Sequence, residues 1–209
     1  MLAPSLMATG LVFGLIHAMD PDHLITISSL AARSDGRASA YRCAASWAMG
    51  HGTVVLGAVA SALLLGRTIP AGVSTAAEMV VGLILVVAGS MLIYPLIARS
   101  AEPLRDPVGP TVALRQKAPF MVGMVHGTAG TAGMLALLPA AALAPLAGLV
   151  YALTFSAGTL AGMIGFSLLF DRARSLAVDR LPAALAGLRL ALGVVAVGFG
   201  AFWLVEAAL

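Results

Sequence analysis

The stretch that decides the fold is GLIHAMDPDHL, residues 14–24, which carries two histidines and two aspartates. It lies inside an apolar segment that runs from about residue 5 to residue 32, long enough to cross a bilayer as a helix. A charged side chain at the centre of such a helix costs about 2.5–3.5 kcal/mol on insertion scales. The two aspartates therefore require partners, and the stretch predicts a polar site within the membrane.

Pro21 predicts a break in this helix. Its nitrogen cannot donate to the carbonyl of His17, and its ring clashes with that carbonyl. On a regular helix His17, Asp20 and His23 share one face, because residues three apart are neighbours. Asp22 points elsewhere unless the helix is distorted. We therefore expect the helix to open between His17 and Pro21, so that a freed carbonyl, two imidazoles and one or two carboxylates converge.

This set of donors suits a divalent transition metal. Imidazole combined with oxygen ligands favours nickel, cobalt, copper or zinc, and a tetragonal arrangement would favour nickel. Broken backbone at membrane depth is tolerated only where it is buried in protein or lines an aqueous cavity. The alternative is a proton relay or a helix-kinking polar network without a metal. We prefer the metal, because four ionisable groups within seven residues exceed what a kink requires.

The other two histidines of the chain also lie inside predicted spans. His51 lies between Gly50 and Gly52, which allow a neighbouring helix or an ion to approach closely. A lone membrane histidine is usually a packing residue, but here the pattern recurs in the first, second and fourth spans. His126 is therefore either a ligand or a packing residue. The predicted metal site comprises His17, Asp20, Asp22, His23, His51 and His126.

The composition of the whole chain is that of a membrane protein. Of the 209 residues, 60% are hydrophobic and 10% are charged, whereas a soluble domain carries about 25% charged residues. The sequence predicts an all-α membrane protein with one domain, residues 1–209, that crosses the inner (plasma) membrane of a bacterium several times. Six spanning stretches are expected near residues 5–32, 40–66, 72–97, 119–138, 142–170 and 183–208.

Basic residues predict the orientation of these spans. Ten of the 12 Lys and Arg residues lie in or beside three loops, near residues 33–42, 98–118 and 171–182. The remaining two are Arg67 and Arg189, the latter inside the sixth span. Because cytoplasmic loops are enriched in Lys and Arg, we expect these three loops to be cytoplasmic and both termini to be non-cytoplasmic.

A weak internal repeat relates the two halves of the chain. The sequence GLIHA at residues 14–18 is similar to GMVHG at residues 123–127, and the following spans match in order at offsets between 108 and 111. An odd number of spans per half inserts the halves in opposite orientations. We therefore expect two inverted three-helix repeats, about residues 5–97 and 119–208, joined by a cytoplasmic loop at 98–118. Such repeats are typical of alternating-access transporters whose site lies near the midplane.

At these residues the sequence resembles the nickel/cobalt transporter family, including its short, six-helix branch often called urease accessory membrane proteins. Residues 17–23, HAMDPDH, fit the family pattern His-Ala-x-Asp-x-Asp-His, and residues 50–55, GHGTVV, fit a second pattern. Residues 123–127 are similar to the shorter branch. The resemblance implies metal ligands or selectivity determinants at His17, Asp20, Asp22 and His23, with His51 beside them.

The sequence departs from its longer relatives in three respects. The additional helix that precedes the family motif in longer importers is missing, and so are the acidic signatures of their later helices. The loop at residues 98–118 lacks the His-rich stretch of some exporters. The identity of the metal and the choice between import and export therefore stay open.

Together these features predict a secondary transporter whose substrate is Ni²⁺ or Co²⁺, with no permanently bound cofactor. No phosphate-binding Gly-x4-Gly-Lys-Ser/Thr motif is present, so the energy would come from the membrane potential or a proton gradient. The alternatives are a membrane accessory protein that delivers nickel to metalloenzyme maturation, and an exporter of a different cation.

Enzymes and nucleic-acid-binding proteins fit the sequence poorly. A membrane enzyme that relays thiols needs two cysteines, and the chain has only Cys43. A His-Glu-x-x-His protease motif is absent. No basic patch is interleaved with aromatic residues, so no nucleic-acid partner is expected. The expected partners are a divalent metal ion and the lipid bilayer, and an oligomer is left open.

Overall fold

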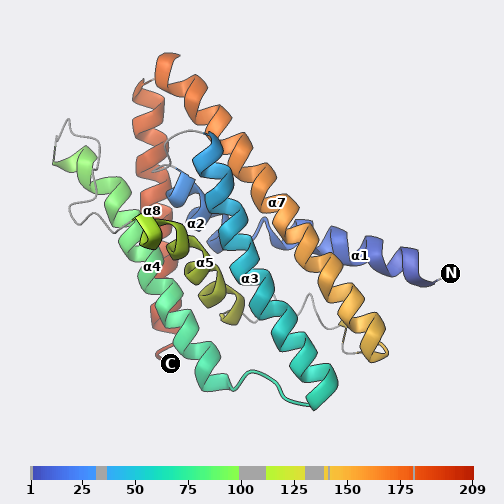
Figure 1. Cartoon of the computed structure of the whole chain (residues 1–209). Helices are drawn as coiled ribbons and strands as arrows, with labels where there is room; N and C mark the ends of the chain where they lie inside the picture. Colours follow the sequence, from blue (N-terminus) through green and yellow to red (C-terminus); the bar gives the residue numbers. More distant parts are fainter. Residues whose placement is uncertain (1, 32–36, 99–111, 130–138, 141, 181) are drawn as a thin grey trace.

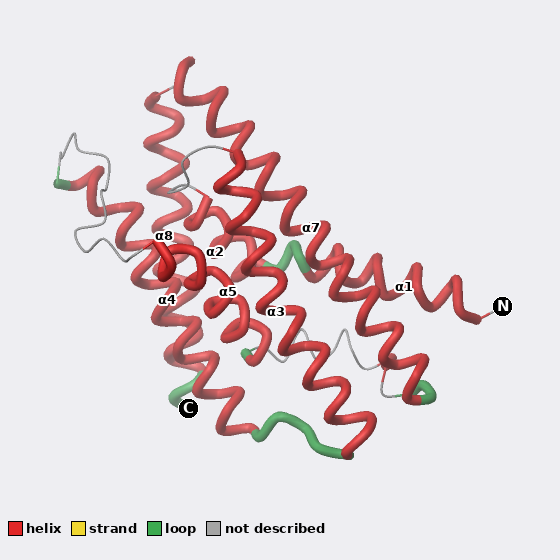
Figure 2. Tube along the Cα trace, viewed as in Figure 1, coloured by secondary structure: helices red, strands yellow, loops and turns green. Residues whose placement is uncertain are grey.

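The computed structural model describes residues 2–31, 37–98, 112–129, 139–140, 142–180 and 182–209. All regular secondary structure within these residues is helical (Figure 2). The helices are α1 (Leu2–His17), α2 (Pro21–Ala31), α3 (Arg37–Leu65), α4 (Ala71–Ile97), α5 (Val112–Thr128), α7 (Pro145–Arg180) and α8 (Pro182–Glu206).

Four of the helices are long and apolar enough to cross a membrane, and α1 contributes a shorter apolar helix, Pro4–His17. At most a third of the apolar window of each long helix is buried inside the protein. Large side chains such as Leu65 and Leu169 are largely exposed. So much exposed apolar surface on helices of spanning length is typical of a protein that lies in a bilayer, so the chain is a multi-pass membrane protein. The long segments are Ala38–Leu65, Ala71–Ile97, Pro145–Ala173 and Ala186–Glu206.

The first predicted span is divided into two helices where Pro21 predicts the break. α1 ends at His17, and α2 begins at Pro21. Proline is favourable as the first residue of a helix because its missing N–H would have no partner there. The His17 carbonyl is not free, contrary to expectation, because it accepts a hydrogen bond from the Asp20 N–H at 3.0 Å.

Two predicted boundaries are wrong. α5 begins at Val112, inside the predicted loop at 98–118, so Pro119 lies within the helix. α7 continues to Arg180, through the predicted break at 171–182. Both extensions are rich in Ala, Leu and Arg, which favour helix. The predicted boundaries were taken from the apolar pattern, which marks only the part of a helix that lipid covers. Residues 130–138 of the fourth predicted span lie outside the described residues.

Glycines determine how α1 packs on α7. Gly10 of α1 lies against the backbone of Tyr151 in α7. One turn further along, Gly14 lies against the backbone of Phe155. The contacts advance in the same direction along both helices, so α1 and α7 run parallel. Close backbone contact at small residues is the usual way in which membrane helices associate.

The same arrangement joins α3 to α5. Gly123 of α5 lies against Trp47 of α3, and Gly127 lies against His51, so these helices are also parallel. By contrast, α4 and α8 run antiparallel, because Gly82 meets Gly200 while Gly89 meets Gly193. Figure 1 shows these pairs packed around α2.

The half-helix α2 lies at the centre of the bundle. It contacts α3, α4, α7 and α8, and residues 25–29 are all buried. α3 and α7, which flank it, run antiparallel: the Ser167 hydroxyl donates to the Ala40 carbonyl at 3.2 Å, whereas Gly148 lies against Leu63. Protein therefore surrounds the side of the break on which His17 and His23 lie, whereas Met19 and Pro21 are exposed.

The close crossing of α3 and α5 predicts opposite effects for two substitutions in one helix. A methyl group at Gly50 would overlap the Phe120 carbonyl of α5, so Gly50→Ala should destabilise the protein by about 1–3 kcal/mol. Gly57 has no described atom within 4 Å of such a methyl group, so Gly57→Ala should be neutral or stabilising by up to about 1 kcal/mol. Thermal unfolding in detergent would measure both, and equal effects would contradict the described crossing.

Candidate metal centre

Three buried histidines from three helices meet at the break. His17 is the last residue of α1, His23 lies in the first turn of α2, and His51 lies in the middle of α3. One ring nitrogen from each lies within 4.8 Å of the other two. We call these residues the three-histidine group. The side chains of all three are at most 7% exposed, so their nitrogens are removed from bulk water.

The distances within the three-histidine group fit a single metal ion. The Nε2 atoms of His17 and His51 are 3.4 Å apart. The ring centroids of His17 and His23 are separated by 4.6 Å, and those of His23 and His51 by 5.1 Å. Metal–nitrogen bonds of about 2.0–2.1 Å place two nitrogen ligands roughly 3.0–3.5 Å apart. Small side-chain adjustments would therefore bring the three imidazoles around one ion.

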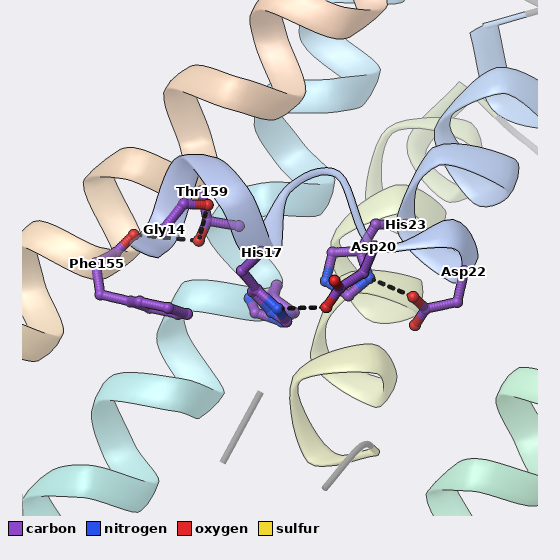
Figure 3. A network of polar contacts seen from close by, with 8 residues as sticks. Gly14, His17, Asp20, Asp22, His23, Phe155 and Thr159 are labelled. Carbon is purple, nitrogen blue, oxygen red and sulfur yellow. Dashed lines mark hydrogen bonds and ion pairs between the residues drawn. The ribbon is translucent and has the colours of Figure 1, made fainter. Parts of the chain in front are cut away.

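Asp20 supports His17 from outside the group. The Nδ1 atom of His17 lies 2.7 Å from Asp20 Oδ2 (Figure 3). A carboxylate accepts and does not donate, so Nδ1 carries the hydrogen and Nε2 keeps its lone pair. Hydrogen bonding of this kind to a ligand histidine fixes its tautomer and its orientation. The Nε2 lone pair of His17 is thus directed to the side on which His51 lies.

Asp22 has a similar place beside His23. Its Oδ1 atom lies 3.0 Å from His23 Nδ1 (Figure 3), at an angle outside hydrogen-bonding geometry. Asp22 and Asp20 are both only partly buried. The structure therefore places the two carboxylates next to the imidazoles, with one acid for each of two histidines.

Several nitrogens of the group lack a hydrogen-bond partner within the described part of the chain. They are both ring nitrogens of His23 and Nδ1 of His51. Buried polar atoms in proteins are nearly always paired, and leaving one unpaired is costly. Buried imidazole nitrogens that have no hydrogen-bond partner are available to bind a metal ion.

His126 lies beside this group but is not part of it. Its Nδ1 donates to the Val122 carbonyl at 3.1 Å, so its Nε2 accepts from the Thr26 hydroxyl at 3.2 Å. Its ring contacts that of His23 edge-on, with centroids 5.9 Å apart. Both nitrogens of His126 are thus hydrogen-bonded in this structure.

Two aromatic side chains that line the site were not predicted from the sequence. The ring of Phe155 lies 5.2 Å from that of His17, and Trp47 contacts three histidines. The signal was present in the internal repeat, since an offset of 108 residues relates Trp47 to Phe155. The same offset relates His51 to Thr159, whose hydroxyl donates to the Gly14 carbonyl (Figure 3).

Comparison with known proteins gives one informative match. The chain is 30% identical over 172 residues to the urease accessory protein UreH of Bacillus sp. (strain TB-90), an alignment that covers 79% of this chain and 75% of the relative. No family model matches the chain, and no solved structure matches it.

The support that Asp20 gives to His17 predicts a loss of metal binding without it. Asp20→Asn removes the charge that holds the His17 tautomer, so the affinity for Ni²⁺ should fall about 10–100-fold. Ser28→Ala is the matched control, because Ser28 is buried in α2 and its hydroxyl donates to the Leu24 carbonyl of its own helix. Calorimetric titration of the purified protein would measure both. An Asp20→Asn protein with unchanged affinity would show that the His17–Asp20 contact does not support the site.

Proposed function

The chain belongs to the family of the urease accessory protein UreH, and from that premise we propose that it transports Ni²⁺, or Co²⁺, across a bacterial inner membrane through the three-histidine group. The ion is substrate and not a resident cofactor, and no catalytic step is needed. The observation that carries the proposal is the convergence of His17, His23 and His51 at a broken helix inside a multi-pass membrane protein.

The surroundings of the three-histidine group support a divalent cation as its occupant. Two carboxylates, Asp20 and Asp22, lie beside the imidazoles and together offset the charge of one dication. Without negative charges nearby, the free-energy cost of moving an ion from water into this buried site would be prohibitive. Imidazole nitrogens combined with carboxylate or water oxygens suit nickel and cobalt, and nickel is the metal of urease, the enzyme that the relative's name refers to.

The helix pairing supports two inverted repeats. Exchanging the halves converts the α1–α7 pair into the α5–α3 pair and returns the α4–α8 pair to itself. The contacts agree in detail, since Gly14 meets Phe155 whereas Gly123 meets Trp47. In this proposal the chain has six spans. The first consists of α1 together with α2, and the second and third are α3 and α4. The fourth is the segment that begins with α5, and the fifth and sixth are α7 and α8.

Alternating access would then arise from movement of one half against the other around a site near the midplane. A potential of 100 mV, negative inside, contributes about 2.3 kcal/mol per charge. A dication therefore gains about twice that on moving inward. We accordingly propose uptake as the physiological direction.

A second candidate function is supported by the relative's description as an accessory protein. A membrane accessory protein could bind nickel at the same group and deliver it to metalloenzyme maturation without carrying it across the bilayer. The two functions differ in what the purified chain does alone, because only a transporter moves the ion into sealed vesicles.

The transport proposal predicts nickel uptake by proteoliposomes that contain only this chain, driven by a negative interior potential. His17→Ala removes one of three ligands and should lower the uptake rate at least about tenfold. The reason is that loss of a residue that only hydrogen-bonds to a metal ligand already lowers metal affinity or activity about 10–100-fold. Ser28→Ala, buried in the neighbouring helix, should transport normally. Parallel measurements with Co²⁺, Zn²⁺ and Mn²⁺ would rank the substrates. Nickel binding without uptake would favour the accessory function, and normal uptake by His17→Ala would exclude the proposed site.

The proposed orientation predicts which positions face the cytoplasm. With Cys43 replaced by Ser, Thr68→Cys in the Gly66–Pro70 connection should react with a membrane-impermeant maleimide added to intact spheroplasts. Ser175→Cys, near the other face at the end of α7, should react only after permeabilisation. Both positions are exposed, and α3 and α7 run antiparallel. The reverse labelling pattern would invert the orientation.

A further inference from the structure

Trp47 lies at the centre of the histidine cluster, although neither the metal ligands nor the carboxylates include it. Its side chain is fully buried. Its indole stacks on the ring of His51, with planes 16° apart and centroids separated by 5.4 Å. It meets His23 edge-on at 5.0 Å and His126 at 5.3 Å. One side chain thus touches three of the four histidines of the chain.

Hydrogen bonding does not account for the position of Trp47. Its Nε1–H has no partner among the described residues, although it is buried. An unpaired buried donor is unfavourable, so the faces and edges of the ring must provide the favourable contacts. Aromatic rings attract one another in stacked and edge-on arrangements, and Trp47 makes both kinds with imidazoles.

The three ligand histidines differ in what restrains them. His17 is hydrogen-bonded to Asp20 and packs against Phe155, and His23 has Asp22 beside it. His51 has no carboxylate partner in the described part of the chain, and its Nδ1 is unpaired there. His51 contacts His17 and His23 within the group. From outside the group, the stacked indole of Trp47, one turn earlier in α3, restrains the plane of the His51 ring.

The internal repeat gives independent support for a role of this kind. The offset that relates Trp47 to Phe155 also relates His126 to His17 within one residue. Each aromatic ring contacts the histidine of the first helix in the other half, at 5.2 Å for Phe155 with His17 and 5.3 Å for Trp47 with His126. Trp47 makes the additional contacts with His51 and His23, which belong to the three-histidine group.

We propose that Trp47 is the positioning residue of the metal site, which holds the imidazole planes of His51 and His23 so that their nitrogens face the ion. This inference rests on the proposed metal-binding role of the three-histidine group. Without the indole, the His51 ring turns about its Cβ–Cγ bond and the group relaxes to a different geometry. Trp47 therefore sets both the affinity for the metal and the geometry in which the metal is held.

Two replacements at position 47 separate the ring from the volume that it fills. Trp47→Phe keeps a ring that can stack on His51, whereas Trp47→Leu fills part of the space without one. The full-length protein would be titrated with Ni²⁺ and with Co²⁺, whose absorption bands report the geometry of its ligands. We expect Trp47→Phe to bind within a few-fold of the native protein. We expect Trp47→Leu to bind about 10–100-fold more weakly, as for lost ligand support, and to shift the Co²⁺ bands.

The other tryptophan of the chain provides the control. Trp203 lies in α8, where its ring contacts Phe199 at 6.5 Å, and Trp203→Leu should leave affinity and spectrum unchanged. Three results would each overturn the inference. Trp47→Leu could keep the native metal affinity and Co²⁺ bands, or Trp47→Phe could bind the metal as weakly as Trp47→Leu. In the third, Trp203→Leu would lose as much metal affinity as Trp47→Leu. A native protein that binds nickel but does not transport it would refute only the proposed transport, whereas a native protein that binds neither metal would overturn both.

Discussion

The missing hydrogen on the nitrogen of Pro21 is the constraint on which the site depends. Pro21 cannot donate to the His17 carbonyl and its ring clashes with that carbonyl. The helix is interrupted here, and the chain turns through Ala18 and Met19 before α2 begins. The turn brings the rings of His17 and His23 into edge-on contact, with centroids 4.6 Å apart. On an unbroken helix the six-residue separation would place the two rings almost two turns apart along the axis. A backbone defect thus brings imidazoles together that a regular helix would keep apart.

A defect of this kind is tolerable because the N–H groups of residues 18–20 are hydrogen-bonded within the chain and neighbouring helices bury His17 and His23. Lipid offers no partner for the backbone groups around the break, so α2 must be enclosed by α3, α4, α7 and α8. That enclosure requires backbones to approach closely, and the glycines at positions 14, 50, 123 and 158 make it possible. The two patterns therefore depend on each other: the glycines allow the helices to pack closely, and this close packing buries the histidines.

The sequence predicted the features that arise from local chemistry. Pro21 marked the break, the apolar composition marked a membrane protein, and the histidines drew attention to the helices that meet at the site. It also predicted that one or two carboxylates converge with the imidazoles, but not that Asp20 lies against His17 and Asp22 against His23, because periodicity gives the face of a helix and not the atoms that touch. It also placed the ends of α5 and α7 wrongly, since apolar length measures lipid contact and not helix length. The contacts of Trp47 depend on the packing of α3 against two other segments, which no local pattern encodes.

The glycine crossings lie very close to the three-histidine group, and this has a mechanical consequence. Gly14 precedes His17 by three residues, and Gly50 directly precedes His51. The helix backbones approach most closely around these glycines, so in the proposed transport a rocking of one half against the other would have its fulcrum there. A rotation about a fulcrum displaces atoms in proportion to their distance from it, so the ends of the long helices sweep wide arcs while the nearby imidazoles hardly move. A rocking bundle of this design would keep its ion coordinated throughout the stroke, while the aqueous opening passes from one membrane face to the other.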